Sequence, residues 1–316
     1  MTSPSQSMFI EAIAQHPQLP APGSGRTLQR WQSLAHLSSQ DMGACKLAEA
    51  HWDALVILDD LQRSDLHTPA RRWGVWAAEH PQHRALLIHR DDQPLLQGKK
   101  TWCTGADCVT HALMTCQDAD GQTWLVALDM ASPGIRLQAQ NWHNAGMRHA
   151  ATYEIDFDHT PVWLIGPRSQ YLQRPGFWHG GAGIAACWYG ATTAVANVLR
   201  SKLDTAQPHA SAHLGAMFIQ LSAARAMLHA LAARMDAAPQ NKHLEHIYAV
   251  RAQVRDVATQ VMERSARALG PAPLCMHAEH AQRCADLTIW CTQQHAEKDW
   301  EHLGHMVRQG DASWTL

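Results

Sequence analysis

The sequence has little of what marks several classes of protein. Charged residues are only 17% of its 316 residues, with 26 basic against 28 acidic side chains and no long run of either sign. An electrostatic footprint for nucleic acid is therefore absent, and we expect no nucleic-acid partner. The N-terminus lacks the basic-then-apolar order of a signal peptide, and no apolar stretch of about 18 residues suits a membrane span. We expect a cytoplasmic protein with no membrane partner.

Motifs for metal or nucleophilic chemistry are also missing. The 8 cysteines form no C-x-x-C pair, so reduced and mostly buried thiols are expected. Histidine is abundant, but a zinc site needs three or four ligands and HExxH is absent. We interpret the histidine pairs spaced by three as solvated helix faces and predict no metal site; these pairs are His243/His246, His277/His280 and His302/His305. The stretch HGGAG at 179–183 is similar to the backbone-donor loop of some esterases, but the sequence has no G-x-S-x-G motif to supply the nucleophile.

What the sequence does contain is a change of periodicity at two places. Residues 1–72 carry apolar residues at helical spacing, as in Leu28, Trp31, Leu34 and Leu37. Residues 73–166 alternate in short apolar runs between Gly, Pro and Asp turns, which predicts an antiparallel sheet. Residues 167–316 return to the helical period in four long segments, the last from about Glu279 to Met306, and this predicts a four-helix bundle. The expected fold class is α+β.

One strand-like stretch carries the most specific signal. LLQGKKTWCTGADCVTHALMTC, followed by TWLVALDMASPGIR, resembles the middle domain of the acyl-CoA dehydrogenase superfamily of flavoproteins, where a Gly-x-Lys-x-Trp-x-Thr strand lines the flavin. With the helix, sheet and bundle order, the resemblance extends over roughly residues 40 to 306. It implies a divergent member with a shortened N-terminal helical region. The alternative is a Trp and Thr strand that only packs a sheet.

The resemblance also implies an FAD site formed by two strands. WGVWAAEHP at 73–81 is similar to the first flavin-contacting strand, and it implies mainly backbone hydrogen bonds from Val75, Trp76 and Ala77. The second strand implies flavin contacts from Trp102, Cys103 and Thr104, with the Trp102 ring against the flavin and Thr104 near its reactive nitrogen. The family's Thr-Glu-Pro-Gly-x-Gly-Ser loop is replaced here by WAAEHPQH.

The catalytic base is where the sequence departs from the family. Dehydrogenation of an acyl thioester needs a carboxylate that removes the alpha proton, yet the two positions used in the family fall on Gln173 and Gln294. An amide is no general base. His295 and Glu297 are the neighbouring candidates, His295 because imidazole titrates near neutral pH. For Glu297 the alternative is the solvated face of a terminal helix.

These features give three classes of function. The first is an FAD-dependent oxidoreductase like an acyl-CoA dehydrogenase, acting on a thioester of CoA or of an acyl-carrier protein, or a relative of the flavin monooxygenases and oxidases that share the fold. The second is a non-catalytic protein that binds a small ligand. The third is a scaffold without a cofactor. The resemblance further implies a homo-oligomer, either a dimer or a tetramer, since the family's bundle helices pair between subunits.

Overall fold

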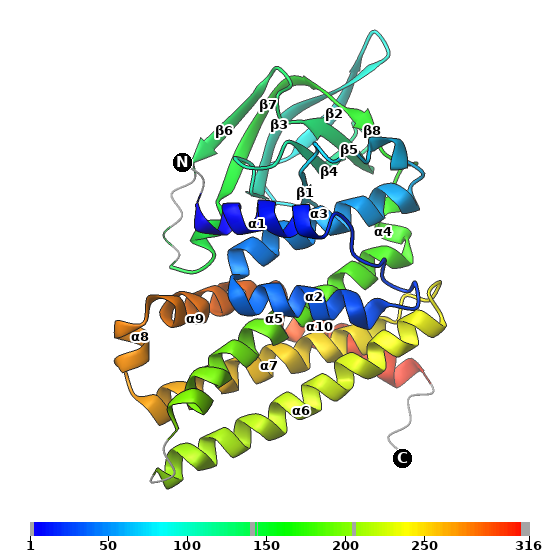
Figure 1. The fold of residues 1–316 in the computed structure, drawn as a ribbon. Coiled ribbons are helices and arrows are strands. Elements are labelled where there is room, and N and C mark those ends of the chain that lie inside the picture. Colours follow the sequence, from blue (N-terminus) through cyan, green and yellow to red (C-terminus); the bar gives the residue numbers. More distant parts are fainter. Residues whose placement is uncertain (1–2, 140–142, 144, 204–206, 311–316) are drawn as a thin grey trace. The chain divides into compact units, whose positions relative to one another are not determined.

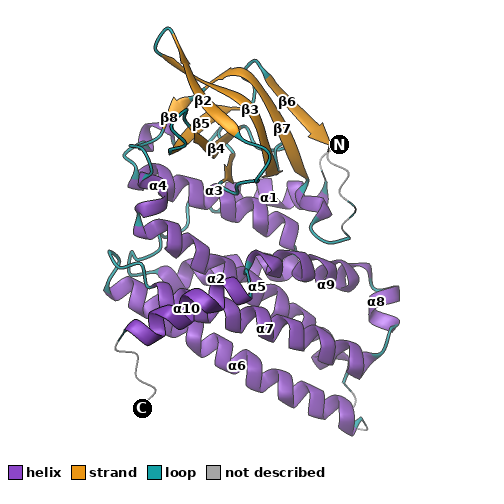
Figure 2. Ribbon diagram, turned by 180° about the vertical axis from the view of Figure 1, so that it is seen from behind, coloured by secondary structure: helices purple, strands orange, loops and turns teal. Residues whose placement is uncertain are grey.

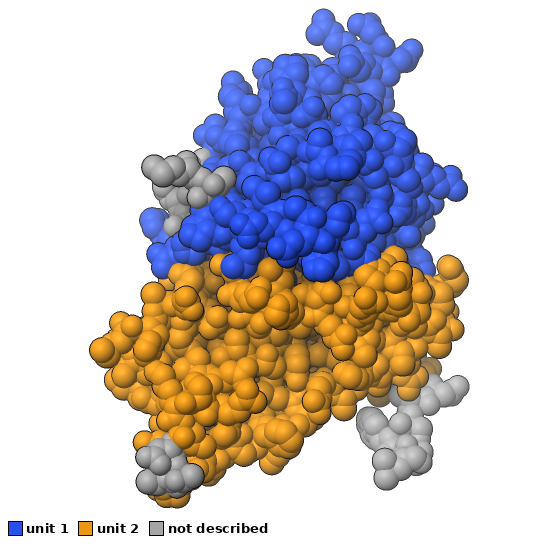
Figure 3. Space-filling model, viewed as in Figure 1, with its two compact units in different colours: residues 1–19, 43–143, 148–177 blue, residues 20–42, 144–147, 178–316 orange. Residues whose placement is uncertain are grey.

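The computed structural model describes residues 3–139, 143, 145–203 and 207–310. The chain divides into two compact units (Figure 3), which we call unit 1 (1–19, 43–143 and 148–177) and unit 2 (20–42, 144–147 and 178–316). The N-terminal helical region therefore contributes residues to both units. The three-part division at residues 72 and 166 stays a prediction.

The N-terminal region is helical, as its apolar spacing predicted. Its helices are α1 (Pro4–Gln15), α2 (Thr27–Gln40) and α3 (Met42–Asp60), followed by the 3-10 turn η1 (Ser64–Leu66) (Figure 1). Ser3 caps α1 in a reciprocal capping box: its hydroxyl accepts from the backbone N–H of Gln6, and the Gln6 side chain accepts from the N–H of Ser3.

The middle region is an eight-stranded sheet in unit 1. Its strands are β1 (Trp73–Trp76), β2 (Ala85–Arg90), β3 (Gln93–Thr104), β4 (His111–Gln117), β5 (Thr123–Asp129), β6 (Ile135–Ala139), β7 (Thr152–Pro161) and β8 (Trp163–Leu164). The order is β6-β7-β3-β2-β4-β5-β8, with β1 beside β4. Asp91 and Asp92 both have positive φ and make the tight turn of the β2–β3 hairpin.

The antiparallel prediction holds for most strand pairs but not for all. β4 pairs in parallel with β1 along four residues and with β2 at Leu86. The β2–β3 hairpin lies between β1 and β4 in the sequence, so these two strands are not joined by a hairpin and can run in the same direction.

The core of unit 1 lies between α3 and one face of the sheet (Figure 2). Leucine and isoleucine side chains of α3 pack against Trp73 of β1, Leu113 of β4 and Leu125 of β5. Trp73 and Leu113 are fully buried. Because this face is fixed by large apolar side chains, β1 is held in a defined position relative to β4 and β5.

Unit 2 is built from α2 and from most of the C-terminal helices. These are α5 (Pro175–Lys202, whose first residues belong to unit 1), α6 (Pro208–Ala237), α7 (Leu244–Leu269), α8 (Ala272–Met276), α9 (Ala278–Trp290) and α10 (Glu297–Gln309). The short α4 (Gln170–Gln173) precedes α5 in unit 1. α5 crosses α2 so closely that a Cβ at Gly190 would lie 2.0 Å from the carbonyl oxygen of Ala35. Glycine at this position is therefore explained by helix packing.

The predicted last helix, from Glu279 to Met306, is wrong as a single helix. The chain leaves α9 through the 3-10 turn η3 (Cys291–Gln293) and restarts at Glu297. Ala296 has φ +45°, outside the helical region. Two hydrogen bonds hold the break: the Gln294 side chain accepts from the N–H of Ala296, and the Asp299 carboxylate accepts from the N–H of His295.

Among the described residues, two helices, α5 and α6, are long and apolar enough to cross a membrane by length and composition, although no such segment was expected from the sequence. In α5, 72% of the apolar window is buried inside the protein, as in the core helix of a soluble protein, whereas 28% is buried in α6. Length and composition alone do not distinguish a membrane span from a core helix.

Candidate functional site

Strand β3 presents Trp102 through a break in its pairing with β7. Lys100 pairs with Ile155 and Cys103 with Tyr153, so Thr101 and Trp102 together face the single residue Glu154. This is a β-bulge, and Trp102 has φ +58°, a left-handed conformation that a bulky residue rarely adopts. The residue is 39% exposed. The bulge therefore directs a large aromatic ring toward the surface of unit 1.

The other residues predicted to contact flavin lie at the ends of β1 and β3 and differ in how deeply their side chains are buried. The buried Trp76 donates from Nε1 to the carbonyl oxygen of Thr104 at 3.0 Å, which ties the end of β1 to the end of β3. Cys103 is fully buried, and burial raises the pKa of its thiol. Val75, Ala77 and Thr104 are half-buried. Trp76 and Cys103 can offer only backbone groups to a ligand.

Beneath this surface lies a buried ammonium group. Lys100 is 2% exposed, and its Nζ lies 2.8 Å from Glu79 Oε1 and donates to the hydroxyl and carbonyl oxygens of Thr115. The Thr115 hydroxyl donates to the same Glu79 carboxylate at 2.5 Å. These contacts fasten the segment after β1 to both β3 and β4. A buried Lys is stable only when paired in this way.

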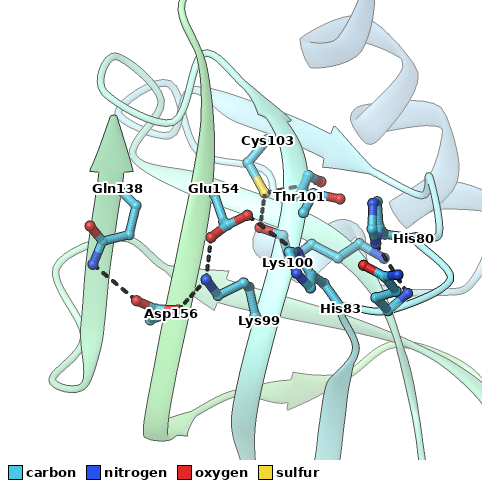
Figure 4. A network of polar contacts seen from close by, with 10 residues as sticks. His80, His83, Lys99, Lys100, Thr101, Cys103, Gln138, Glu154 and Asp156 are labelled. Carbon is cyan, nitrogen blue, oxygen red and sulfur yellow. Dashed lines mark hydrogen bonds and ion pairs between the residues drawn. The ribbon is translucent and has the colours of Figure 1, made fainter. Parts of the chain in front are cut away.

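A second polar network continues along the same strands (Figure 4). Glu154 and Asp156 of β7 both pair with Lys99 of β3, and the Glu154 hydrogen bond raises the pKa of Lys99. Glu154 Oε2 also lies 3.3 Å from His83 Nδ1. The network therefore leads from β7 toward the loop that follows β1.

The acid–base candidates lie at the break between α9 and α10 in unit 2. The exposed imidazole of His295 has its Nδ1 3.7 Å from Oδ1 of Asp299, whose carboxylate is largely buried. The same carboxylate accepts the His295 backbone N–H at 2.9 Å. Glu297 is exposed in the first turn of α10. At 3.7 Å the imidazole and the carboxylate are neighbours without a hydrogen bond between them. His295 and Glu297 both stay acid–base candidates, and His295 is the one that has a carboxylate beside it.

The two glutamines differ in their surroundings. Gln173 is exposed at the end of α4 in unit 1. Gln294 in unit 2 is 3% exposed; its oxygen accepts from the Ala296 N–H, and its Nε2 has no hydrogen-bond partner among the described residues. Gln294 is thus a buried amide whose donor group is unused.

Comparison of sequences gave no relative: no protein-family model and no curated protein matches this chain. Comparison of structures did. Butyryl-CoA dehydrogenase from Megasphaera elsdenii is 14% identical with a TM-score of 0.78, over 98% of this chain and 99% of that one. FMN-bound TdsC, a dibenzothiophene monooxygenase from a Paenibacillus species, is 12% identical with a TM-score of 0.78, over 97% and 98%. A nitrososynthase from Micromonospora carbonacea var. africana is 17% identical with a TM-score of 0.76, over 91% and 83%.

The chain has the fold of the acyl-CoA dehydrogenase superfamily. The likeness covers nearly the whole chain. The predicted architecture is therefore confirmed: a helical N-terminal region, a middle sheet and C-terminal helices. At these identities the likeness concerns the fold alone, and function has to be argued from the residues.

Within this acyl-CoA dehydrogenase fold, several residues next to the candidates of each unit were missed from the sequence. Asp299 was not singled out beside His295, and the pairing of Lys100 with Glu79 was not foreseen. His80 and His83 were quoted only as part of a replaced loop. The spacing His80-x-x-His83 after a strand was the one visible signal. Among the described residues, no group of three or more His, Cys, Asp and Glu side chains is placed to hold a metal ion.

Proposed function

We propose that this protein binds a flavin against strand β3 and is a flavin-dependent oxidoreductase. The observation that carries the proposal is the exposed Trp102 ring, held in a left-handed bulge within the Gly98–Thr104 strand of an acyl-CoA dehydrogenase fold. A bulky residue in that conformation is strained, and such strain is concentrated at functional sites. Flavin supplies hydride and electron transfer, while the protein binds, orients and shields its ring.

The residues present fit a planar ring with polar edges. Trp102 offers an aromatic face, and Thr104 a hydroxyl that is 3.1 Å from the Thr152 hydroxyl. Val75 and Ala77 are half-buried at the end of β1 and offer backbone groups. The buried Trp76 and Cys103 support these groups from below. We propose FAD as the flavin; FMN is the alternative, because it is the flavin bound to TdsC.

His295 is the group we propose for proton transfer. Its imidazole is exposed, and Asp299 fixes its backbone and faces its Nδ1. We propose that His295 takes the place of the family's carboxylate when the substrate is an acyl thioester of CoA or of an acyl-carrier protein. Glu297 remains the second candidate, and substitution of each residue separates them.

A monooxygenase or oxidase is the second candidate function. The observation that favours it is Gln294, because the position expected for a catalytic carboxylate holds a buried amide with an unused donor. An amide can hydrogen-bond a ligand but cannot remove an alpha proton. If the protein catalyses no reaction, the alternatives are that it binds a small ligand without catalysis or serves as a scaffold.

The test begins with visible absorption. The purified protein is mixed with FAD or FMN, desalted and scanned, alongside Trp102→Ala and, as control, Trp163→Ala, an exposed Trp on β8. We expect flavin bands in the wild type and the control and their loss in Trp102→Ala. A colourless wild type at saturating FAD and FMN would refute the proposal.

A second step distinguishes the reactions. Anaerobic bleaching of bound flavin by acyl-CoA thioesters, abolished in His295→Ala and retained in Glu297→Ala, supports the dehydrogenase. Oxygen consumption only when chemically reduced flavin is supplied supports the monooxygenase or oxidase. We further propose that the protein is cytoplasmic and forms a homo-oligomer.

A further inference from the structure

His80 is held in place from three directions. It follows Ala77 by three residues, and its ring packs against Trp102 with 5.3 Å between ring centroids. It also stacks on His83, at 4.5 Å between centroids and an interplanar angle of 28°. Its Nδ1 accepts the backbone N–H of Gln82 at 3.1 Å. Such a ring has little freedom to turn, so its remaining nitrogen is preorganised.

The hydrogen bond to Gln82 decides which nitrogen carries the proton. A backbone N–H can only donate, so Nδ1 is the acceptor, and in the neutral imidazole the proton is on Nε2. Nε2 has no hydrogen-bond partner among the described residues. His80 is therefore a fixed N–H donor next to the exposed ring of Trp102.

The support for His80 reaches back into the sheet. His83, which stacks on it, has its Nδ1 3.3 Å from Glu154, and Glu154 is paired with Lys99 (Figure 4). Glu154 is the residue of β7 opposite the bulge that contains Trp102. The β7 residue opposite the bulge thus contacts the histidine that stacks on His80.

Given the proposed flavin site, on which this inference rests, we propose that His80 Nε2–H donates to the edge of the flavin and favours its reduced form. In the proposed site, the flavin ring contacts the end of β1 and Trp102. His80 follows β1 and packs on Trp102, so it lies beside that ring. Reduction adds negative charge to the flavin ring, and a preorganised donor at its edge stabilises that charge. His80 is then a group that tunes the cofactor's affinity for electrons.

The experiment compares flavin affinity in two redox states. His80→Phe keeps a flat ring for stacking but has no donor, His80→Gln keeps a donor, and His89→Phe is the control, an exposed histidine on β2. For each protein, the Kd of oxidised and of anaerobically reduced flavin is measured by titration, together with the midpoint potential. We expect His80→Phe to weaken reduced flavin about tenfold more than oxidised flavin, equivalent to about 30 mV of lower potential.

The outcomes separate this inference from the proposed function. A His80→Gln variant closer to wild type than His80→Phe, with His89→Phe unchanged, supports the donor. Equal weakening of both redox states in His80→Phe would mean that the ring only stacks and would overturn the inference while leaving the flavin site in place. If the wild type binds neither flavin, the proposed function fails and this inference with it. If His80→Phe does not fold, His80→Leu, which also lacks a donor, replaces it and is compared with His80→Gln in the same titrations.

Discussion

At the scale of the residue, Trp102 combines a left-handed backbone conformation with the aromatic ring that we propose contacts the flavin. A non-glycine residue in the left-handed region loses roughly 1 to 2 kcal/mol relative to its ordinary conformation. The sheet tolerates this at Trp102 because the bulge is fixed by β7 on one side and by the Trp76 hydrogen bond to Thr104 on the other. The strain is therefore a property that can be measured separately from the aromatic ring.

Glycine in place of Trp102 tests the strain. We expect Trp102→Gly to unfold in urea with a free energy about 1 kcal/mol higher than Trp102→Ala, because glycine accepts positive φ without a Cβ clash. At Leu86, an exposed strand position not in the left-handed region, the order should reverse, with glycine less stable than alanine by about 0.5 to 1 kcal/mol. Equal stability of the two Trp102 variants would contradict the bulge geometry.

His51 on α3 links protonation to stability. Its Nδ1 accepts the backbone N–H of Trp73 at 3.2 Å, and burial, with smaller effects of His67 and Arg72, lowers its pKa to about 4 from 6.5. Below pH 6.5 the unfolded chain binds this proton more readily than the folded one, so stability falls as pH drops from about 6.5 toward 4. The full loss is roughly 3 kcal/mol.

Urea unfolding at pH 7 and pH 4.5 measures this loss. We expect His51→Asn to reduce the difference in unfolding free energy between the two pH values by roughly 2 to 3 kcal/mol. The exposed His89→Asn variant should behave as the wild type does. The same pH dependence in His51→Asn and wild type would show that other groups account for it.

At the scale of the element, the sequence predicted what depends on local burial and missed what depends on distant partners. Apolar periodicity located the helices and strands because each buries one face. The break after η3 was missed because QQHAEKDWEHL is a reasonable helical pattern, and only the hydrogen bonds of Gln294 and Asp299 show the interruption. The parallel pairing of β1 with β4 was missed because the residues of one strand do not determine which strand it pairs with or in which direction.

The crossing of α2 and α5 gives the prediction at this scale. Because a Cβ at Gly190 would lie 2.0 Å from Ala35 O, Gly190→Ala should destabilise the protein by about 2 to 3 kcal/mol. Gly181 in the same helix has no heavy atom within 4 Å of such a Cβ, so Gly181→Ala should stabilise it by up to about 1 kcal/mol. Thermal and urea unfolding of both variants measure the contrast. A similar effect at both glycines would mean that the crossing is looser than described.

At the scale of the whole molecule, the proposed homo-oligomer can be tested at α6. The adjacent residues Phe218 and Ile219 are 69% and 66% exposed, and large exposed apolar side chains are common at interaction sites. A bilayer is a poor occupant for this helix because Arg225 is exposed near its middle, and an arginine at the membrane centre is unfavourable by about 2.5 kcal/mol or more. A second copy of the chain fits the proposed homo-oligomer.

Introducing negative charge at the two apolar positions of α6 decides between these occupants. Sedimentation velocity should show the wild type as a dimer or tetramer and the double variant Phe218→Glu, Ile219→Glu as a monomer with an unchanged helical spectrum. Met276→Glu is the control, because Met276 is 79% exposed at the end of α8, away from α6 in the sequence, and should leave the oligomer intact. A monomeric wild type that floats with lipid vesicles, and a double variant that does not, would assign the surface of α6 to a membrane instead, since the same apolar side chains would then be buried in lipid.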